Sequence, residues 1–167
     1  MKESGLTLIE LMVTIAIMGV LASVAVPLSN VSGKRTRELE LREHLRTVRA
    51  AIDTFKSDWN RDGDTLLGAQ CLKNKLTCKE VSGVSGYPKS LTVLLGVKLT
   101  GGEAAVAENA TRRYLRKIPV DPMTVKEWKL RCYIDPADAS TWCGEDVYDL
   151  ASFSTDVGLD GKTYREW

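Results

Sequence analysis

The sequence predicts an α+β protein in which a long N-terminal helix is packed on a small antiparallel sheet in the head that follows it. Residues 6–26 form a nearly uninterrupted apolar run, and about 20 apolar residues in a helix can span a bilayer. Residues 33–60 continue with helical periodicity. Short alternating segments separated by turn-forming residues occupy the last part of the chain, as expected for short strands.

Composition places the chain among ordinary globular proteins with one modest head. Of its 167 residues, 44% are hydrophobic and 27% are charged. The residues after the apolar run, about 140, suffice for one core. The net charge is +1, so no basic excess points to a nucleic-acid partner.

The apolar run contains a single charged residue, Glu10. A carboxylate within a membrane-spanning helix costs about 2.5–3.5 kcal/mol and normally has a partner. No Lys, Arg or His occurs between Glu3 and Lys34. Cleavage after Gly5 would create a positive amine at Leu6, on the same helix face as Glu10. The alternatives are an unpaired Glu10 near the membrane edge, or a cleaved secretory signal, which would have a basic start and a shorter apolar core.

The segment Gly5-Leu6-Thr7-Leu8-Ile9-Glu10-Leu11 resembles the processing site of type IV prepilins and type II secretion pseudopilins. The resemblance implies cleavage after Gly5 by a membrane prepilin peptidase, N-methylation of Leu6, and pairing of Glu10 with the terminal amine of an adjacent subunit. Leu6 stands where this family usually has Phe. Pro27 corresponds to a helix-bending proline in these proteins, although by itself a proline here is equally consistent with the end of the membrane segment.

Two segments of the head resemble the type II secretion major pseudopilin and its relatives. They are residues 86–91, GYPKSL, and residues 114–123, YLRKIPVDPM. In that family the first run opens a short helix and the second leads into a small antiparallel sheet. The resemblance therefore implies a pilin-like fold with a cleaved leader at 1–5, a transmembrane and assembly helix at 6–32, and a periplasmic head at 33–167.

Within the head, a stripe of apolar residues spaced by three and four predicts one buried helix face. Its members are Leu41, Leu45, Val48, Ile52, Phe55 and Trp59. The charged residues between them, including Arg49, are expected to face solvent. Ser90 and Gly96 predict the two ends of a short helix, and residues 104–113 a second one. Strands are expected at 127–134, 146–154 and 162–166.

Four cysteines predict disulfides in an exported head. Cys71 and Cys78 enclose six residues, and Cys132 and Cys143 enclose ten. Three connectivities are possible, and the two local pairs are preferred, each contributing about 2.5–3 kcal/mol. The alternative is a zinc site made of all four cysteines, but neither pair has the usual gap of two to four residues.

Calcium is a further candidate ligand. Asp58, Asn60 and Asp62, followed by Gly63, fit the first half of a calcium loop, although Ala69 stands where that loop has its bidentate Glu. The alternative is a polar turn at the end of the long helix. The major pseudopilin family binds calcium in a C-terminal loop, but the tail here is shorter and has fewer clustered carboxylates. Only Asp156 and Asp160 are candidates there.

No spacing in the chain marks a catalytic set, so we expect a structural role and no enzyme. The resemblance implies a subunit of a type II secretion pseudopilus. The implied partners are other pilin-like subunits, the prepilin peptidase, an inner-membrane assembly platform and membrane lipid. The expected location is the inner membrane with the head in the periplasm. The alternatives are a minor pilin of a surface type IV pilus and a membrane-anchored periplasmic binding module that does not assemble.

Overall fold

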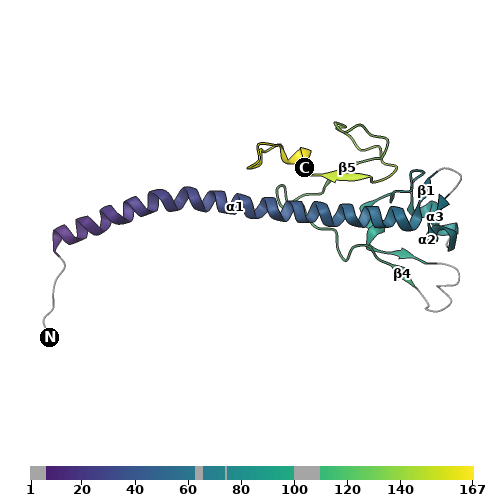
Figure 1. The fold of residues 1–167 in the computed structure, drawn as a ribbon, viewed down its shortest axis with the longest axis horizontal. Coiled ribbons are helices and arrows are strands. Elements are labelled where there is room, and N and C mark those ends of the chain that lie inside the picture. The colour runs from purple at the N-terminus through teal and green to yellow at the C-terminus, as the bar shows by residue number, and fades with distance from the viewer. Residues whose placement is uncertain (1–6, 63–65, 74, 100–109) are drawn as a thin grey trace. The chain divides into compact units, whose positions relative to one another are not determined.

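The structure is a computed structural model that describes residues 7–62, 66–73, 75–99 and 110–167 (Figure 1). Gly5 and Leu6, the predicted processing pair, lie outside the described residues. The helices and strands follow one another in the order α1 Leu8–Trp59, β1 Arg61–Asp62, β2 Leu66–Leu67, α2 Ala69–Lys73, α3 Lys75–Val81, η1 Leu91–Leu95, β3 Val97–Lys98, β4 Thr111–Arg112, β5 Lys129–Arg131, β6 Asp149–Ala151 and η2 Tyr164–Glu166, where η denotes a 3-10 helix.

The chain forms two compact units, residues 1–39 and residues 40–167, and the long helix α1 contributes to both. The expected long N-terminal helix is therefore confirmed, and it continues through Pro27 without a break. A membrane-spanning segment was expected within 6–32. Among the described residues, no helix combines the length and the apolar character needed to cross a membrane.

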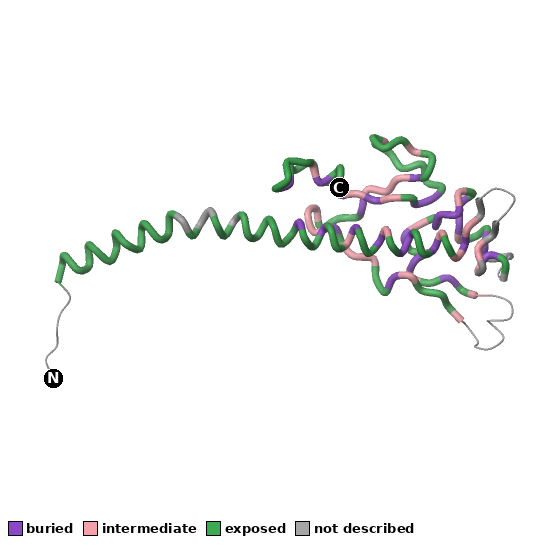
Figure 2. The backbone as a smooth tube through the Cα atoms, in the orientation of Figure 1, coloured by how far each residue is buried: buried purple, intermediate pink, exposed green. Residues whose placement is uncertain are grey.

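The second part of α1 supplies the central face of the head's core. All six residues of the predicted stripe are at most 3% exposed, from Leu41 to Trp59. Figure 2 shows buried positions recurring along this part of the helix. They pack in one apolar cluster with residues from η1, β3, β6 and η2, among them Leu94, Val97, Leu150 and Tyr164. The stripe thus covers the head's own core, as its spacing predicts.

Among the described residues of the head, antiparallel pairing is divided among three two-stranded sheets, β1–β2, β3–β4 and β5–β6. Strands β5 and β6 lie inside the predicted ranges 127–134 and 146–154, although each is only three residues long. Their register pairs Leu130 with Leu150, which is 1% exposed. The two strands therefore contribute one buried side chain to the core and otherwise serve to place the loops on either side.

The strand predicted at 162–166 is wrong. Residues Tyr164–Glu166 form the 3-10 helix η2, and only Thr163 makes a single bridge, to Val157. The cause is the tight loop before it, in which Gly161 adopts a left-handed φ of 81° and the Gly158 N–H donates to the Lys162 carbonyl at 2.7 Å. This loop turns the chain so that Tyr164 is buried in the core instead of extending along a neighbour.

The second short helix predicted at 104–113 is also wrong where it can be compared. Residues 104–109 lie outside the described part of the chain, and Thr111–Arg112 form β4, paired with β3. Helix η1 begins and ends where Ser90 and Gly96 predict, although Ser90 makes no side-chain cap. A Cβ on Gly96 would lie 2.9 Å from Cγ2 of Thr111, so glycine allows β4 to approach closely.

A buried carboxylate organises the connection between β4 and β5. Asp121 is 0% exposed. It accepts hydrogen bonds from Met123 N–H at 2.9 Å, from Thr124 Oγ1 at 2.8 Å and from Ser152 Oγ at 2.7 Å. The last of these ties the turn to the segment after β6. Such a group is stable in the interior only because its oxygens are satisfied by donors.

Replacing Ile52 with Ala should remove about 2–5 kcal/mol from the free energy of unfolding, because a fully buried side chain leaves a cavity. The measurement is urea unfolding of the full chain in detergent, followed by tryptophan fluorescence, since all four tryptophans lie in the head. The control is Ser57→Ala on the exposed side of α1, which should change stability by less than about 0.5 kcal/mol. Equal effects of the two substitutions would contradict the assignment of the stripe.

Candidate functional site

The N-terminal end of α1 is organised by Thr7 and Glu10. The Thr7 side-chain oxygen accepts the Glu10 main-chain N–H at 3.3 Å, and the Thr7 carbonyl accepts the Leu11 N–H at 3.2 Å. Thr7 is therefore the N-cap of a helix that begins at Leu8, and Glu10 is the third helical residue. Thr-x-x-Glu is the sequence pattern of a capping box, and by itself it would predict this helix start.

Glu10 is exposed in the single chain, in the first turn of α1. A carboxylate in this position interacts favourably with the positive end of the helix dipole. Glu10 therefore stabilises the start of its own helix, in addition to the predicted pairing with a terminal amine. Leu6 lies outside the described residues, so that pairing stays a prediction.

Exposed apolar side chains recur along α1 between Leu8 and Val31. Exposed fractions of 52–75% are found for Leu8, Ile9, Leu11, Met12, Val13, Ile15, Ile17, Met18, Val20, Leu21, Leu28 and Val31. Soluble monomeric proteins rarely expose a continuous apolar surface of this kind, which marks a binding or membrane surface. Two hydroxyl groups in this stretch bond to the helix itself, Thr14 Oγ1 to the Leu11 carbonyl and Ser23 Oγ to the Val20 carbonyl. These polar atoms are therefore satisfied without water.

The cysteines form two disulfides, Cys71–Cys78 and Cys132–Cys143, with Cα–Cα distances of 5.1 and 6.0 Å. This is the local connectivity that the spacing favours, in place of a four-cysteine zinc site. The first bond joins α2 to α3 and contributes two buried sulfurs to the core. The second closes the loop between β5 and β6, with Cys132 fully buried and Cys143 at the surface.

The first calcium candidate lies where α1 ends. Asp58 Oδ2 accepts hydrogen bonds from Tyr114 O–H at 2.9 Å and from Arg112 Nε at 3.2 Å. Burial, together with the Asp58 hydrogen bond, raises the pKa of the Tyr114 phenol well above its ordinary value. Asn60 follows α1 directly, and the side chain of Asp62 lies outside the described part of the chain. The Asp58 carboxylate thus links α1 to β4, and calcium binding here stays a prediction.

The second pair of candidates lies in the C-terminal segment. Asp160 Oδ2 lies 3.3 Å from the Arg42 guanidinium, and its other oxygen accepts the Lys162 N–H at 3.1 Å. Asp156 is exposed, and its carbonyl accepts the Tyr164 N–H at 3.1 Å. Within the described residues, neither aspartate belongs to a group of three close metal-ligating side chains.

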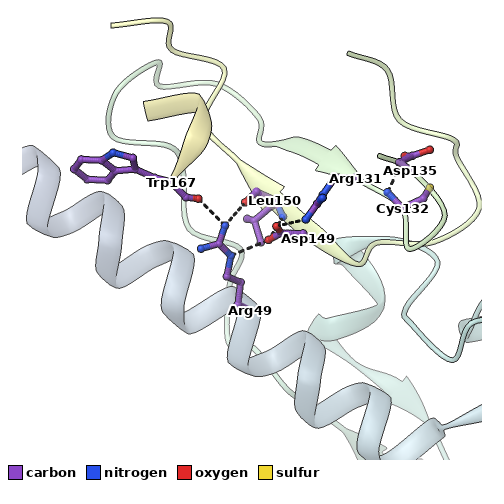
Figure 3. Close-up of polar contacts among 7 residues, drawn as sticks. All are labelled: Arg49, Arg131, Cys132, Asp135, Asp149, Leu150 and Trp167. Carbon is purple, nitrogen blue, oxygen red and sulfur yellow. Dashed lines mark hydrogen bonds and ion pairs between the residues drawn. The ribbon is translucent and has the colours of Figure 1, made fainter. Parts of the chain in front are cut away.

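Arg49 connects α1 to the C-terminal half of the head (Figure 3). Its guanidinium donates to Asp149 Oδ1 at 2.8 Å, to the Leu150 carbonyl at 3.1 Å and to the main-chain oxygen of Trp167 at 2.7 Å. Arg131 binds the other oxygen of Asp149 at 2.9 Å. The side chain of Arg49 is 38% exposed, so it faces solvent only in part. Its partners are about 100 or more residues away in sequence, and no local pattern indicates them.

Comparisons with known proteins bear on both units. Residues 1–26 match the family model described as the prokaryotic N-terminal methylation motif. Type II secretion system core protein G of Aeromonas hydrophila is 37% identical over 78 residues, 46% of this chain and 53% of that protein. The Pectobacterium carotovorum protein of the same name is 36% identical over 78 residues, 46% of this chain and 49% of that protein. The chain thus spans about half the length of these two relatives.

A longer match decides the family. Type II secretion system core protein G of Pseudomonas aeruginosa is 32% identical over 122 residues, which are 72% of this chain and 68% of that protein. The chain belongs to the type II secretion system core protein G family. The resemblance to pilin-like proteins, and to the type II secretion pseudopilin in particular, is therefore confirmed. No solved structure matches the chain.

The matches to known proteins extend over both units of the chain. The methylation motif covers Gly5, Leu6, Glu10 and the exposed apolar part of α1 as far as residue 26. The match of 122 residues is too long for the first unit alone, so it includes part of the head. The similarity to core protein G is therefore not confined to the N-terminal motif.

Replacing Arg49 with Lys should lower the free energy of unfolding by about 1–2 kcal/mol, because an ammonium cannot reproduce the forked contacts to Asp149 and two main-chain oxygens. Urea unfolding of the full chain in detergent measures this loss. The matched control is Arg46→Lys, an exposed arginine on the same helix, which should be neutral. A neutral Arg49→Lys variant would show that the contacts do not stabilise the head.

Proposed function

We propose that this protein is a structural subunit of a pilus-like filament, the pseudopilus of a type II secretion-type system. The observation that carries the proposal is the exposed apolar surface of α1 from Leu8 to Val31, most of which lies within the N-terminal methylation motif at residues 1–26. Such a surface is stable in lipid or against similar helices of neighbouring subunits, and it is unfavourable in water. The role is structural, and the chain performs no catalysis.

The proposed assembly begins in the inner membrane, where the apolar stretch from Leu6 to Val26 inserts before the subunit joins the filament. A membrane prepilin peptidase cleaves after Gly5, and Leu6 is methylated. The new amine of one subunit then pairs with Glu10 of its neighbour on an inner-membrane assembly platform. Since both charges lie in an apolar environment, their attraction is weakly screened and favours one register between neighbouring helices.

The proposed location of the head is the periplasm. Its two disulfides suit an oxidising compartment, because thiols in the cytosol are kept reduced. The buried stripe of α1 and the contacts of Arg49 hold the head to the same helix that carries the apolar surface. A subunit built in this way carries its head into the filament as the helix packs.

Processing can be tested directly on the protein purified from membranes of its own host. We expect intact-mass and N-terminal peptide mass spectrometry to give a chain that starts at Leu6 and carries one methyl group on its amine. Gly5→Ala should accumulate the precursor, because prepilin peptidases cut after Gly. A mature protein that retains Met1 would contradict the proposal, and would favour a membrane-anchored module that does not assemble.

Replacing Glu10 with Gln should reduce filament formation by about tenfold or more, equivalent to about 1.4 kcal/mol per subunit addition. The substitution keeps the size of the side chain and removes the charge that would attract the neighbouring amine. The measurement is the amount of sheared filament relative to membrane-bound subunit, by immunoblot.

The control for this experiment is Glu80→Gln, an exposed acid of the head that should leave assembly unchanged. Normal filament yield from Glu10→Gln would remove the proposed pairing. Loss of secretion in a deletion strain would support the secretion-type system, and loss of surface-pilus motility alone would favour a minor pilin.

A further inference from the structure

Two surfaces of the head differ in charge and lie at different levels along α1. The first is the distal patch, which consists of Val84, Tyr133, Ile134 and Glu145. The second is the basic groove, which lies between α1 and the C-terminal segment. We infer that the distal patch of one copy of this chain docks in the basic groove of the next copy, with Glu145 facing Arg46. The inference rests on the proposed function and deepens it, because it names the head surfaces that join neighbouring subunits.

The distal patch combines exposed apolar side chains with an aromatic anchor. Val84, Tyr133 and Ile134 are 82%, 55% and 72% exposed. The centroid of the Tyr133 ring lies 5.6 Å from that of Tyr87 and 5.5 Å from that of Tyr148, so the ring is held by two others. Clustered exposed apolar groups mark interaction sites, and tyrosines are frequent among the residues that contribute most to binding.

A buried carboxylate joins the segments that form the distal patch. Asp146 is 5% exposed, and it accepts hydrogen bonds from the Ser85 hydroxyl and from the Tyr133 N–H, the latter at 3.0 Å. Ser85 directly follows Val84, and Asp146 directly follows Glu145. The members of the patch are therefore held together before any partner binds, which lowers the entropy lost on docking.

The loop between β5 and β6, which carries most of the distal patch, is fixed in two further ways. The Cys132–Cys143 disulfide closes it. Asp135 Oδ2 accepts the main-chain N–H groups of Cys132 at 2.9 Å and of Cys143 at 3.4 Å. Figure 3 shows Asp135 directed at the main chain of Cys132. The loop is thus a rigid projection of the head, suited to fit a groove.

Glu145 gives the distal patch a negative charge. Its side chain is exposed, and within the described part of the chain it forms no ion pair. The sequence from Cys132 to Gly161 contains seven acidic residues and no Lys, Arg or His. A surface that covers this carboxylate is therefore expected to supply a cation from elsewhere, because protein interfaces are complementary in charge.

The basic groove supplies such a cation. It has a volume of about 560 Å³, and four cations and three acids line it. Two of the cations are paired within the chain, Arg42 with Asp160 and Arg49 with Asp149. Arg46 is exposed and, among the residues that the structure describes, has no such partner. The groove also offers apolar contact area, from Leu45, Ala50 and Trp167.

A smaller cavity of about 180 Å³ adjoins the groove and adds to its positive charge. It shares Arg49 and Trp167 with the groove, and Lys129, Arg131 and Arg165 also line it. Burial, and then the charges of Arg165 and Arg131, lower the pKa of Lys129. The acids nearby therefore leave positive charge uncompensated, and this charge attracts an acidic surface.

One chain cannot bring its own patch and groove together, because they lie at different levels of α1. Lys56 Nζ lies over the Tyr133 ring, 5.4 Å from its centroid. Arg46 precedes Lys56 by ten residues, which is about 15 Å along the helix. A contact between two unlike surfaces of the same chain repeats from copy to copy, and it builds an open filament when the rotation does not close a ring. A second copy is therefore the occupant that we assign to the groove.

The test uses the full chain in its own host, with sheared filaments measured against membrane-bound subunit by immunoblot. Glu145→Arg and Arg46→Glu should each lower the filament yield by about tenfold or more, because like charges would then face each other. The double variant Glu145→Arg/Arg46→Glu should recover a yield within about threefold of the parent, since the pair is restored in reverse.

The matched controls are Glu127→Arg and Arg116→Glu, which reverse exposed charges outside both surfaces and should leave the yield unchanged. Unchanged yield from Glu145→Arg or Arg46→Glu would overturn the inference while the parent still forms filaments. A loss that the double variant does not restore would indicate another partner for these surfaces, and would overturn it equally. A parent that forms no filaments would overturn the proposed function itself, and this inference with it.

Cross-linking gives a second measurement that does not depend on charge or on the stability of the charge variants. Filaments of Ile134→Cys/Ala50→Cys, treated with a short bismaleimide, should give a ladder of dimers, trimers and larger multimers. Each single variant, and the control Ile134→Cys/Arg116→Cys, should give no ladder. Absence of the ladder from the first variant, or an equal ladder from the control, would overturn the inference.

Discussion

Burial of one face of α1 between Leu41 and Trp59 is the interaction on which the rest of the head depends. The strands of the head are two or three residues long, and pairs of this size are not stable without a surface to pack on. The helix supplies that surface, since its six stripe residues are at most 3% exposed. Removing their apolar area from water is the main favourable term, and it gives η1, β6 and η2 a common surface to pack against.

Specific polar contacts then decide how the short elements are arranged around that surface. Arg49 holds β6 and the segment at Trp167 to α1, Asp58 connects the end of α1 to β4, and Asp121 fixes the turn before β5. These side-chain contacts take the place of the hydrogen bonds between strands that a larger sheet would provide. The two disulfides close the loops that these contacts leave open, which restricts the unfolded chain.

Helix α1 is exposed in the first unit of the chain and has a buried face in the second. Its second part is buried in the head, and its first part exposes a continuous apolar surface after the cap formed by Thr7. The hydroxyls of Thr14 and Ser23 bond to helix carbonyls, so these two polar groups are satisfied within the helix. Covering such a surface with lipid or with other helices removes apolar area from water, and this is the physical argument behind the proposed assembly.

Patterns within a short stretch of sequence determined the helix, its buried stripe, the prepilin motif and the local cysteine pairs, because each depends on residues close together in the chain. Tertiary structure alone decided the partners of Arg49, the burial of Asp121 and the splitting of the sheet into three pairs. It also turned 162–166 from an expected strand into η2 and placed Asp135 beside two cysteines. These features depend on contacts between residues that are far apart in the sequence. Local periodicity does not predict such contacts.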